Sequence, residues 1–482
     1  MRTTTRTNAV LYLLCAAALS VSIIANAQVV DGDLTYWRYE DTPEVVDTMG
    51  LGRFDDGSIV AVGADYTSVF DGDGWSILGA AEEQGFVAMI AQGPDGKVWF
   101  RTCPSYQTYT NGYWDREGLH ISQQFSGSWA TDSWLIAIDA WRGKHYLFFT
   151  WTPSYYAGVY AYCDPSCDDM RCVARVYAPP WPYGDERIPE PQCISGDYLM
   201  VYSSWVVRLI RIPSWQIWDI DRSDLWSVGW CIPAGEHDYS WVNCRETPSQ
   251  APGLLQLDCK RWEAISVPWL EGVSIDCLAL DWRGLWVLGS DTETDPAFMV
   301  ALWSFQTQDP DVVRSLSKEV GTSGSSGSPN RLALPSMTVT EGGALWFATD
   351  KAVVKWTPDP ELIPMPYEAR VEARATEDRT VQVEIEFDNL RIIRNDAMLH
   401  LKAEYLREGE DEPIPLQDHI SVYHEFQPQE TFRYSFEYVQ FVLPSMDRIR
   451  YSVYTTYIDV NAPPTDEEIV TSNVATAEVR LD

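Results

Sequence analysis

Basic residues are scarce in this chain. Its 482 residues include 35 lysines and arginines against 70 aspartates and glutamates, which gives a formal net charge of −35 at pH 7. A field of that sign repels phosphate groups, so nucleic acids and anionic membranes are not expected partners. A solvated acidic surface is the favoured interpretation, and the alternative is that some carboxylates hold calcium. The Asp71–Gly74 stretch resembles a calcium loop but lacks the distal glutamate of an EF-hand, so it predicts a hairpin turn. We therefore expect no cofactor, with calcium as the open alternative.

Catalytic signatures are also missing. The six histidines are scattered without a metal-binding spacing, and the chain has no G-x-S-x-G elbow and no phosphate loop. Neighbouring carboxylates, such as Asp185 with Glu186 and Glu236 with Asp238, could serve a glycosidase or a lyase. With 70 acidic residues, however, such neighbours arise by chance. Binding is therefore favoured over catalysis.

A long apolar run occurs only near the N-terminus. Arg2 and Arg6 precede the apolar residues 9–24, and Ala25-Asn26-Ala27 forms a small-x-small cleavage site. This pattern is typical of a secretory signal peptide covering residues 1–27. No later segment approaches the roughly 20 apolar residues that cross a bilayer. The sequence predicts a secreted, periplasmic or cell-surface protein without a transmembrane segment.

Cysteine is absent from the C-terminal part of the chain. Outside the leader, the nine cysteines all fall between positions 103 and 277. In an oxidising compartment most of them should form disulfides, and an odd number leaves one free or paired between chains. Cys163, Cys167 and Cys172 are close enough to suggest zinc. No histidine lies nearby and the leader indicates export, so disulfides are favoured.

A short turn that runs directly into a strand recurs along the chain. In residues 92–100, Pro94, Asp95 and Gly96 form the turn, and Val98, Trp99 and Phe100 begin the strand. Related stretches occur at 54–60, 139–147, 280–289 and 340–347, with weaker copies at 195–201 and 220–228. The residues that mark the seven turns are Gly57, Gly96, Gly143, Gly196, Asp224, Gly284 and Gly343. The tryptophans of the motif are expected in the core; they are Trp99, Trp226, Trp286 and Trp346.

The repeat predicts an all-β fold with a β-propeller over residues 28–364. Each unit supplies about four short strands, and the markers lie 28 to 60 residues apart by subtraction. Such units cannot bury their own faces and must stack around a ring. The 28-residue step is irregular, so six or eight blades remain alternatives to seven. The last unit has only three clear strands, and residues 34–39 are expected to supply its fourth and close the ring.

The turn motif disappears after residue 364, and strict alternation of apolar and polar residues replaces it. The alternating runs are 379–387, 398–405, 432–438, 448–454 and 474–481. Such alternation indicates that one face of the sheet is buried and the other is exposed to solvent. Residues 365–482 are therefore predicted to form an antiparallel β-sandwich of immunoglobulin or fibronectin type.

The turn-strand copies at Asp95, Arg283 and Gly342 resemble the repeats of the two-component-regulator type of propeller, which occurs in bacterial extracellular sensors. In that family a sandwich domain often follows the ring. The resemblance covers about 330 residues at the level of one short motif per blade, and it implies fold more than function. The sequence departs from these sensors because no membrane helix and no kinase follow the sandwich. The resemblance therefore implies at most the ligand-reading half of such a sensor.

Aromatic residues gather in the stretches expected to join the blade strands on one face of the ring. Aromatic rings with polar handles bind glycans and proteins at low entropic cost. The candidate binding residues are Tyr109, Tyr113, Trp114, Tyr155, Tyr156, Trp181, Tyr183, Tyr239 and Trp241. The competing interpretation is that these rings only pack their own long loops. The sequence thus predicts an exported protein that recognises a glycan or a protein, with two alternatives: a polysaccharide-acting hydrolase or lyase, and a structural surface protein.

Overall fold

The computed structural model describes residues 28–480 with gaps. The longer gaps are 81–86, 127–132, 164–173, 178–189, 246–252, 292–297, 307–311, 321–336, 407–412, 440–447 and 458–468, and gaps of up to five residues fall in other connections. Side chains are described for most of the strands of blades 1, 6 and 7 and of the sandwich, and for parts of blades 2 and 4.

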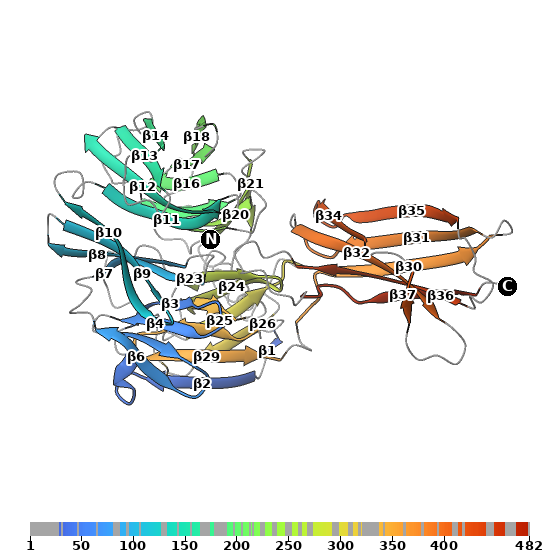
Figure 1. Ribbon diagram of the computed structural model, residues 1–482, viewed down its shortest axis with the longest axis horizontal. Helices are drawn as coiled ribbons and strands as arrows, with labels where there is room; N and C mark the ends of the chain where they lie inside the picture. The colour runs from blue at the N-terminus through green and yellow to red at the C-terminus, as the bar shows by residue number, and fades with distance from the viewer. Residues whose placement is uncertain are drawn as a thin grey trace, which may run out of the picture.

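The described strands confirm the all-β class and the propeller (Figure 1). Within each blade, strands A to D follow one another as an antiparallel sheet. Blade 1 comprises β3 (Thr48–Arg53), β4 (Ile59–Gly63), β5 (Tyr66–Phe70) and β6 (Trp75–Ala80); blade 2 comprises β7 (Val87–Gln92), β8 (Val98–Ser105), β9 (Thr108–Asp115) and β10 (Gly118–Ser126). Blade 3 comprises β11 (Ser133–Trp141), β12 (Lys144–Ser154), β13 (Ala157–Cys163) and β14 (Ala174–Tyr177); blade 4 comprises β15 (Glu190–Ser195), β16 (Tyr198–Ser203), β17 (Val206–Arg211) and β18 (Gln216–Asp221).

The remaining blades complete seven four-stranded units in the described part of the chain. Blade 5 comprises β19 (Ser227–Pro233), β20 (Tyr239–Arg245), β21 (Gly253–Asp258) and β22 (Glu263–Val267); blade 6 comprises β23 (Val273–Asp281), β24 (Gly284–Asp291), β25 (Phe298–Trp303) and β26 (Val312–Leu316). Blade 7 comprises β27 (Met337–Val339), β28 (Leu345–Ala348), β29 (Ala352–Pro358) and, from the start of the chain, β2 (Gly32–Arg38). The short strand β1 (Gln28–Val29) adds in parallel to the outer edge of blade 6, and a 3₁₀ turn covers Pro43–Val45.

The ring closes through the N-terminal strand, as the sequence predicts. Strand β2 pairs antiparallel with β29, with Leu34 opposite Trp356. Four aromatic rings lock blade 7 to blade 1: the Trp37 and Trp346 rings stack at 5.2 Å, and Phe70 and Trp75 lie against both. The closure therefore rests on aromatic packing as well as on backbone pairing.

The turn motif connects strands A and B of most blades. Gly57, Gly96 and Gly343 have φ values of 82°, 68° and 76°, which glycine adopts without steric cost. At Gly96, a Cβ atom would lie 2.5 Å from the backbone nitrogen of Asp55 in the corresponding turn of blade 1. Glycine at this position thus permits close contact between neighbouring blades.

One marker of the repeat is wrong. Residues 222–226, which include Asp224, join β18 to β19 and so connect two blades. The A–B connection of blade 5 is 234–238, which contains Gly235. Replacing 224 by 235 changes the neighbouring steps from 28 and 60 residues to 39 and 49 by subtraction. The irregular spacing came from the wrong turn, not from the fold.

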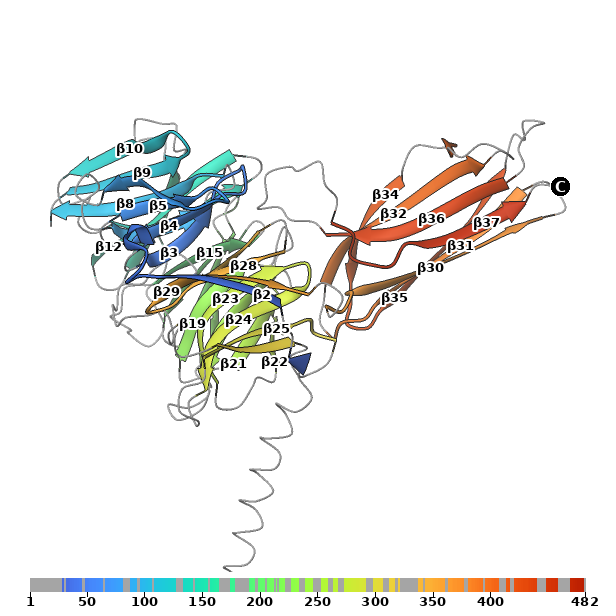
Figure 2. The same ribbon diagram turned by 90° about the horizontal axis from the view of Figure 1, so that it is seen from below.

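The C-terminal part forms two antiparallel sheets, seen as two layers in Figure 2. The first sheet has the order β30 (Tyr367–Ala375), β31 (Thr380–Asn389), β35 (Thr431–Val439). The second contains β32 (Asn395–Leu406), β36 (Arg448–Thr456) and β37 (Ala475–Arg480), with β33 (Ile414–Pro415) and β34 (Ile420–Phe426) on the free side of β32. The core between the sheets includes Val383, Leu399, Phe426 and Val453.

The sandwich contacts the propeller at blade 6. The buried Arg391 donates from Nη2 to the backbone oxygen of Trp282, at 2.7 Å, and the Ile392 N–H donates to the backbone oxygen of Phe305, also at 2.7 Å. Trp282 lies in the A–B turn of this blade, and Phe305 follows strand C. The sandwich therefore sits on the side of the ring where A–B and C–D turns emerge.

Candidate functional site

The antiparallel blades give the ring two different faces. A–B and C–D turns emerge on one face, which we call the turn face, and B–C and D–A connections emerge on the other, which we call the loop face. The contacts of the sandwich at Trp282 and Phe305 belong to the turn face. The candidate aromatic residues were all expected on the loop face.

Strand β9 separates two of these candidates. From the sequence, these residues were expected in a stretch that joins blade strands, whereas residues 108–115 form strand C. Tyr109 lies next to the B–C connection and pairs with Phe125, while Tyr113 pairs with Trp99 near the start of β8. Tyr109 is therefore at the loop-face end of the strand, and Tyr113 is at the turn-face end.

Trp114 does not belong to a binding surface. Its side chain is fully buried among Phe54, Val60, Val69 and Val98, between blades 1 and 2. The expectation that Trp114 is a binding residue is therefore wrong. A large ring on the inner face of a blade strand packs against the neighbouring blade, because each blade must bury its faces on the next one.

Tyr113 is part of a small polar cluster on the turn face. Its half-buried ring stacks on His120 with centroids 4.8 Å apart, and Lys97 Nζ lies 4.8 Å from the centre of the ring. His120 Nε2 is 2.9 Å from Asp115 Oδ1. Sequence reasoning missed Lys97 and His120; the signal was the hairpin Asp115–Gly118, which places His120 opposite Tyr113.

Charged groups of the adjacent turns extend this cluster. Arg116 Nε lies 2.5 Å from Asp56 Oδ2, and Asp56 also accepts hydrogen bonds from the backbone and the hydroxyl of Ser58. Burial raises the pKa of Asp56, but these hydrogen bonds and the Arg116 charge outweigh burial, so the pKa lies below its ordinary value. The carboxylate is therefore ionised and engaged within the protein.

Asp71 closes the predicted hairpin turn between β5 and β6. Its Oδ1 accepts the backbone N–H groups of Asp73 and Gly74 at 3.1 and 3.2 Å, which lowers the pKa of Asp71. In the part of the chain that the structure describes, no three His, Cys, Asp or Glu side chains are grouped so as to hold a metal ion. Calcium remains an expectation from composition alone.

The other candidates are only partly described. Tyr239 and Trp241 lie at the start of β20, next to the A–B connection of blade 5, so their backbone belongs to the turn-face end. Tyr155, Tyr156, Trp181 and Tyr183 lie outside the described residues, as does the Cys163–Cys172 stretch apart from Cys163 itself. Of the motif tryptophans, Trp286 and Trp346 are buried in the core as expected, the side chain of Trp99 is not described, and Trp226 lies outside the described residues.

Comparison with known proteins gives a match in structure only. No family model and no curated protein matches the sequence. The extracellular domain of a B. thetaiotaomicron protein described as a one-component system has 9% identity and a TM-score of 0.43, over 92% of this chain and 59% of that domain. An oligogalacturonate lyase in complex with manganese has 11% identity and a TM-score of 0.48, over 69% of this chain and 100% of the lyase.

A third similar structure is the β-propeller domain of Cps50 (Swd1) from Myceliophteria thermophila. It has 9% identity and a TM-score of 0.46, over 68% of this chain and 99% of that domain. The likeness is one of fold. An extracellular domain of a one-component system, a lyase and the β-propeller domain of Cps50 share it, so it indicates no common activity. The described residues contain no helix long and apolar enough to cross a membrane.

Proposed function

We propose that the chain is an exported binding protein whose loop face recognises a glycan or a protein. The observation that carries this proposal is the position of the sandwich. Its contacts to the ring, from Arg391 and Ile392, are to turn-face residues of blade 6. The sandwich contacts that the structure describes at that blade thus lie on the face opposite to the proposed surface. On the loop face, long connections can vary without disturbing the blades.

Aromatic chemistry supports the loop face as the binding surface. Tyr109 is at the loop-face end of β9. In chain order, Tyr155 and Tyr156 fall in the B–C connection of blade 3, and Trp181 and Tyr183 fall in the D–A connection that follows it. Rings with a polar handle offer stacking area for a sugar or a peptide and one hydrogen bond to fix its orientation. The proposed face thus lies on blades 2 to 4, and it excludes Tyr113, Trp114, Tyr239 and Trp241.

A binding experiment with paired variants tests this assignment. The mature protein is screened on a glycan array, and each hit is titrated by calorimetry against the wild type, Tyr109→Ala, Trp181→Ala and Tyr113→Ala. A ring at the centre of the site should cost about 30-fold in affinity when removed, the effect of a binding hot spot. Tyr109 and Tyr113 lie in the same strand at opposite ends, so Tyr113→Ala is the matched control and should bind normally.

The outcomes separate the alternatives. Equal loss in Tyr109→Ala and Tyr113→Ala would mean that the variants disturb blade 2 rather than a site, and it would remove the support for the loop face. No hit on the array would contradict a glycan ligand and leave a protein ligand to be sought. Shortening of a bound polysaccharide during incubation would replace the binding role by the hydrolase or lyase alternative.

A further inference from the structure

The sandwich has two lateral sides that differ in how the sheets meet. On one side, Asn473 hydrogen-bonds both backbone groups of Ala369 in β30, with Nδ2 to the oxygen at 2.9 Å and the N–H to Oδ1 at 2.8 Å. A parallel bridge between Tyr367 and Ser472 lies beside it. The segment before β37 thus closes the gap between the two sheets on this side.

The opposite side is open. Strands β34 and β35 form it, and within the described residues each pairs with only one strand, β32 and β31 respectively. Val422 shares a face with the core residue Leu399, and Tyr434 shares a face with the core residue Ile385. Both side chains point toward the sandwich interior, yet they are 51% and 56% exposed. Apolar surface that belongs to the interior is therefore uncovered along these two edges.

Strand β35 is long and regular for an edge strand. It has nine residues, with neither proline nor lysine, and it pairs with β31 without a register shift. Natural edge strands are usually short, bulged or interrupted by proline or lysine, because a long regular edge invites pairing with another strand. The free edge of β35 is thus a template for strand addition.

The sequence of β35 is complementary to itself in the antiparallel direction. If two copies pair about a two-fold axis at Ser435, Arg433 of one lies opposite Glu437 of the other, and Tyr434 lies opposite Phe436. Arg433 and Glu437 occupy the same face of the strand, opposite Glu386 and Gln382 of β31. Opposite charges and aromatic pairs directly across a sheet stabilise the pairing.

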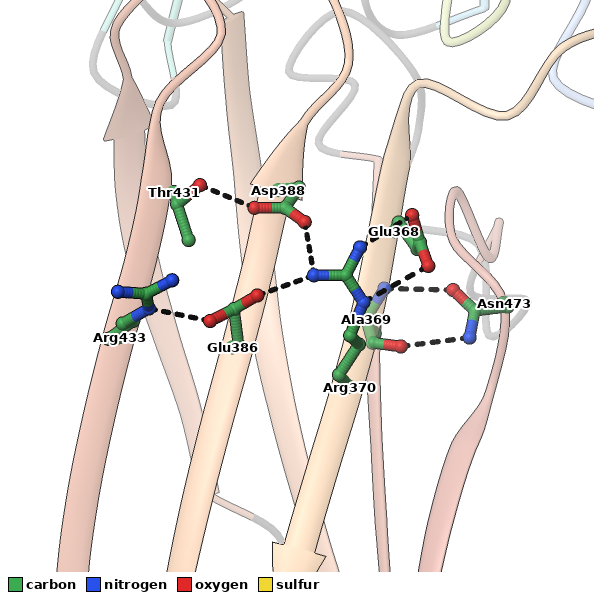
Figure 3. A network of polar contacts seen from close by, with 8 residues as sticks. All are labelled: Glu368, Ala369, Arg370, Glu386, Asp388, Thr431, Arg433 and Asn473. Atoms are coloured by element: carbon green, nitrogen blue, oxygen red, sulfur yellow. Dashed lines mark hydrogen bonds and ion pairs between the residues drawn. The ribbon is translucent and has the colours of Figure 1, made fainter.

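We propose that β35 is the pairing edge between two copies of this chain, joined antiparallel about Ser435 into a continuous six-stranded sheet. The outer face of this sheet carries charged residues next to the proposed contact, among them Arg433 and Glu386 (Figure 3). Arg433 is 74% exposed and bonds Glu386 Oε2 from Nε at 2.5 Å, which leaves its Nη atoms without a partner in the network drawn. These nitrogens can donate to a carboxylate of a neighbouring strand.

The other open edge fits this role less well. A second copy paired through β34 about Tyr423 would place Ser421 opposite Glu425 and Val422 opposite His424. No opposite charges meet in that arrangement, so nothing in the sequence specifies its register. Charge complementarity thus selects β35 as the contact between copies.

Measurement of the molar mass of the mature chain tests the proposal. Light scattering after size exclusion, from micromolar to hundreds of micromolar protein, should show a monomer–dimer equilibrium. Arg433→Glu or Glu437→Arg places like charges opposite each other twice across the two-fold axis and should weaken the dimer at least tenfold. The double variant restores opposite charges and should restore the dimer. A monomer throughout the range would overturn the proposal and leave the edge for a strand from another protein.

A cysteine cross-link tests the register independently. Ser435→Cys places two thiols opposite each other on the axis, where Cα atoms of paired strands are about 4.5 to 5.5 Å apart, within the reach of a disulfide. Mild oxidation should give a reducible dimer for Ser435→Cys and none beyond the wild-type level for Ser421→Cys on β34. A dimer that resists charge reversal and does not cross-link at Ser435 would use another surface, and the proposal would be wrong.

Discussion

In the propeller, the first long strand of the chain completes the last blade: β2 pairs with β29 along seven residue pairs, from Gly32 opposite Pro358 to Arg38 opposite Ala352. In the sandwich, the nine-residue strand β35 pairs with β31 on one side and with nothing described on the other. The ring uses its N-terminal strand to remove an edge, whereas the described part of the sandwich leaves β34 and β35 unpaired on one side. A chain can thus protect one domain by closure and keep an edge of the other for contact.

The closed ring and the open edge of the sandwich also differ in the chain entropy that each requires. Closure of the ring joins residues more than 300 positions apart, so its contacts form against a large loss of chain entropy. The stacked pair Trp37 and Trp346 with its two neighbouring rings supplies part of the compensation. The open edge requires no such closure. It stabilises the protein only when a second strand binds to it.

Removal of the Trp346 side chain, which packs where the propeller closes, should have the largest effect. Trp346 is 2% exposed at the centre of the four-ring cluster, so Trp346→Ala should lower the free energy of unfolding of the propeller by about 3 to 5 kcal/mol. Chemical denaturation followed by circular dichroism measures this change. Tyr434→Ala, at the open edge, is the control and should change the stability of the monomer by no more than about 0.5 kcal/mol. Equal effects would contradict the contrast between the two domains.

The junction between the domains should be the next most sensitive place. Arg391 is buried, and its Nη2 hydrogen bond to Trp282 O is charge-assisted. Arg391→Ala should weaken docking of the sandwich by about 1.5 to 3 kcal/mol, the cost of losing such a bond. Limited proteolysis at the residues between β29 and β30 should become faster. Arg374→Ala, which removes an exposed arginine of the sandwich, should leave the cleavage rate unchanged.

Opening the closed side of the sandwich should have a similar or smaller effect. Asn473→Ala leaves the N–H and C=O of the buried Ala369 without their partners, so the sandwich should lose about 1 to 3 kcal/mol. Asn473→Asp keeps an acceptor for the N–H but cannot donate to the carbonyl, and its loss should be of similar sign. Hydrogen exchange at Ala369 measures the opening directly. Unchanged exchange in both variants would show that Asn473 does not close this side.

The regular parts of the fold follow from local signals in the sequence. Six of the seven turn markers fall at the junction of strands A and B in chain order, and the four of them whose backbone is described, Gly57, Gly96, Gly284 and Gly343, have positive φ. A glycine of this conformation followed by a run of β-forming residues is a local requirement, so the sequence shows it. The seventh, Asp224, was chosen from the motif Asp-Leu-Trp without a glycine, and it belongs to a connection between blades. The closing strand was predictable because the last blade lacked one strand and the first residues supplied it.

The candidate site was less predictable, since the side chains depend on neighbours that are distant in sequence. Tyr109, Tyr113 and Trp114 are close in the chain, yet the strand carries two of them to opposite ends and buries the third against blade 1. Alternation in β35 correctly indicated an inner row that includes Tyr434, but it could not show that no strand covers that row. Which strands end a sheet is a property of the topology, not of the local pattern.

The charged face beside the open edge should respond to acid, with the smallest effect. Hydrogen bonds from Arg433, and then from Arg370, hold the pKa of Glu386 below its ordinary value of 4.5. A carboxyl whose pKa is lowered by folding stabilises the native state above the unfolded pKa, and this stabilisation is lost as the pH falls through the folded pKa. Glu386→Gln should therefore lower the urea midpoint at pH 7 by a small amount, and the difference from the wild type should shrink below pH 4.5.

Glu372→Gln, whose partner Arg374 is 75% exposed, serves as the control and should show a smaller difference at pH 7. If the two variants behave alike at every pH, the ion pair of Glu386 with Arg433 contributes nothing specific to the stability of the monomer.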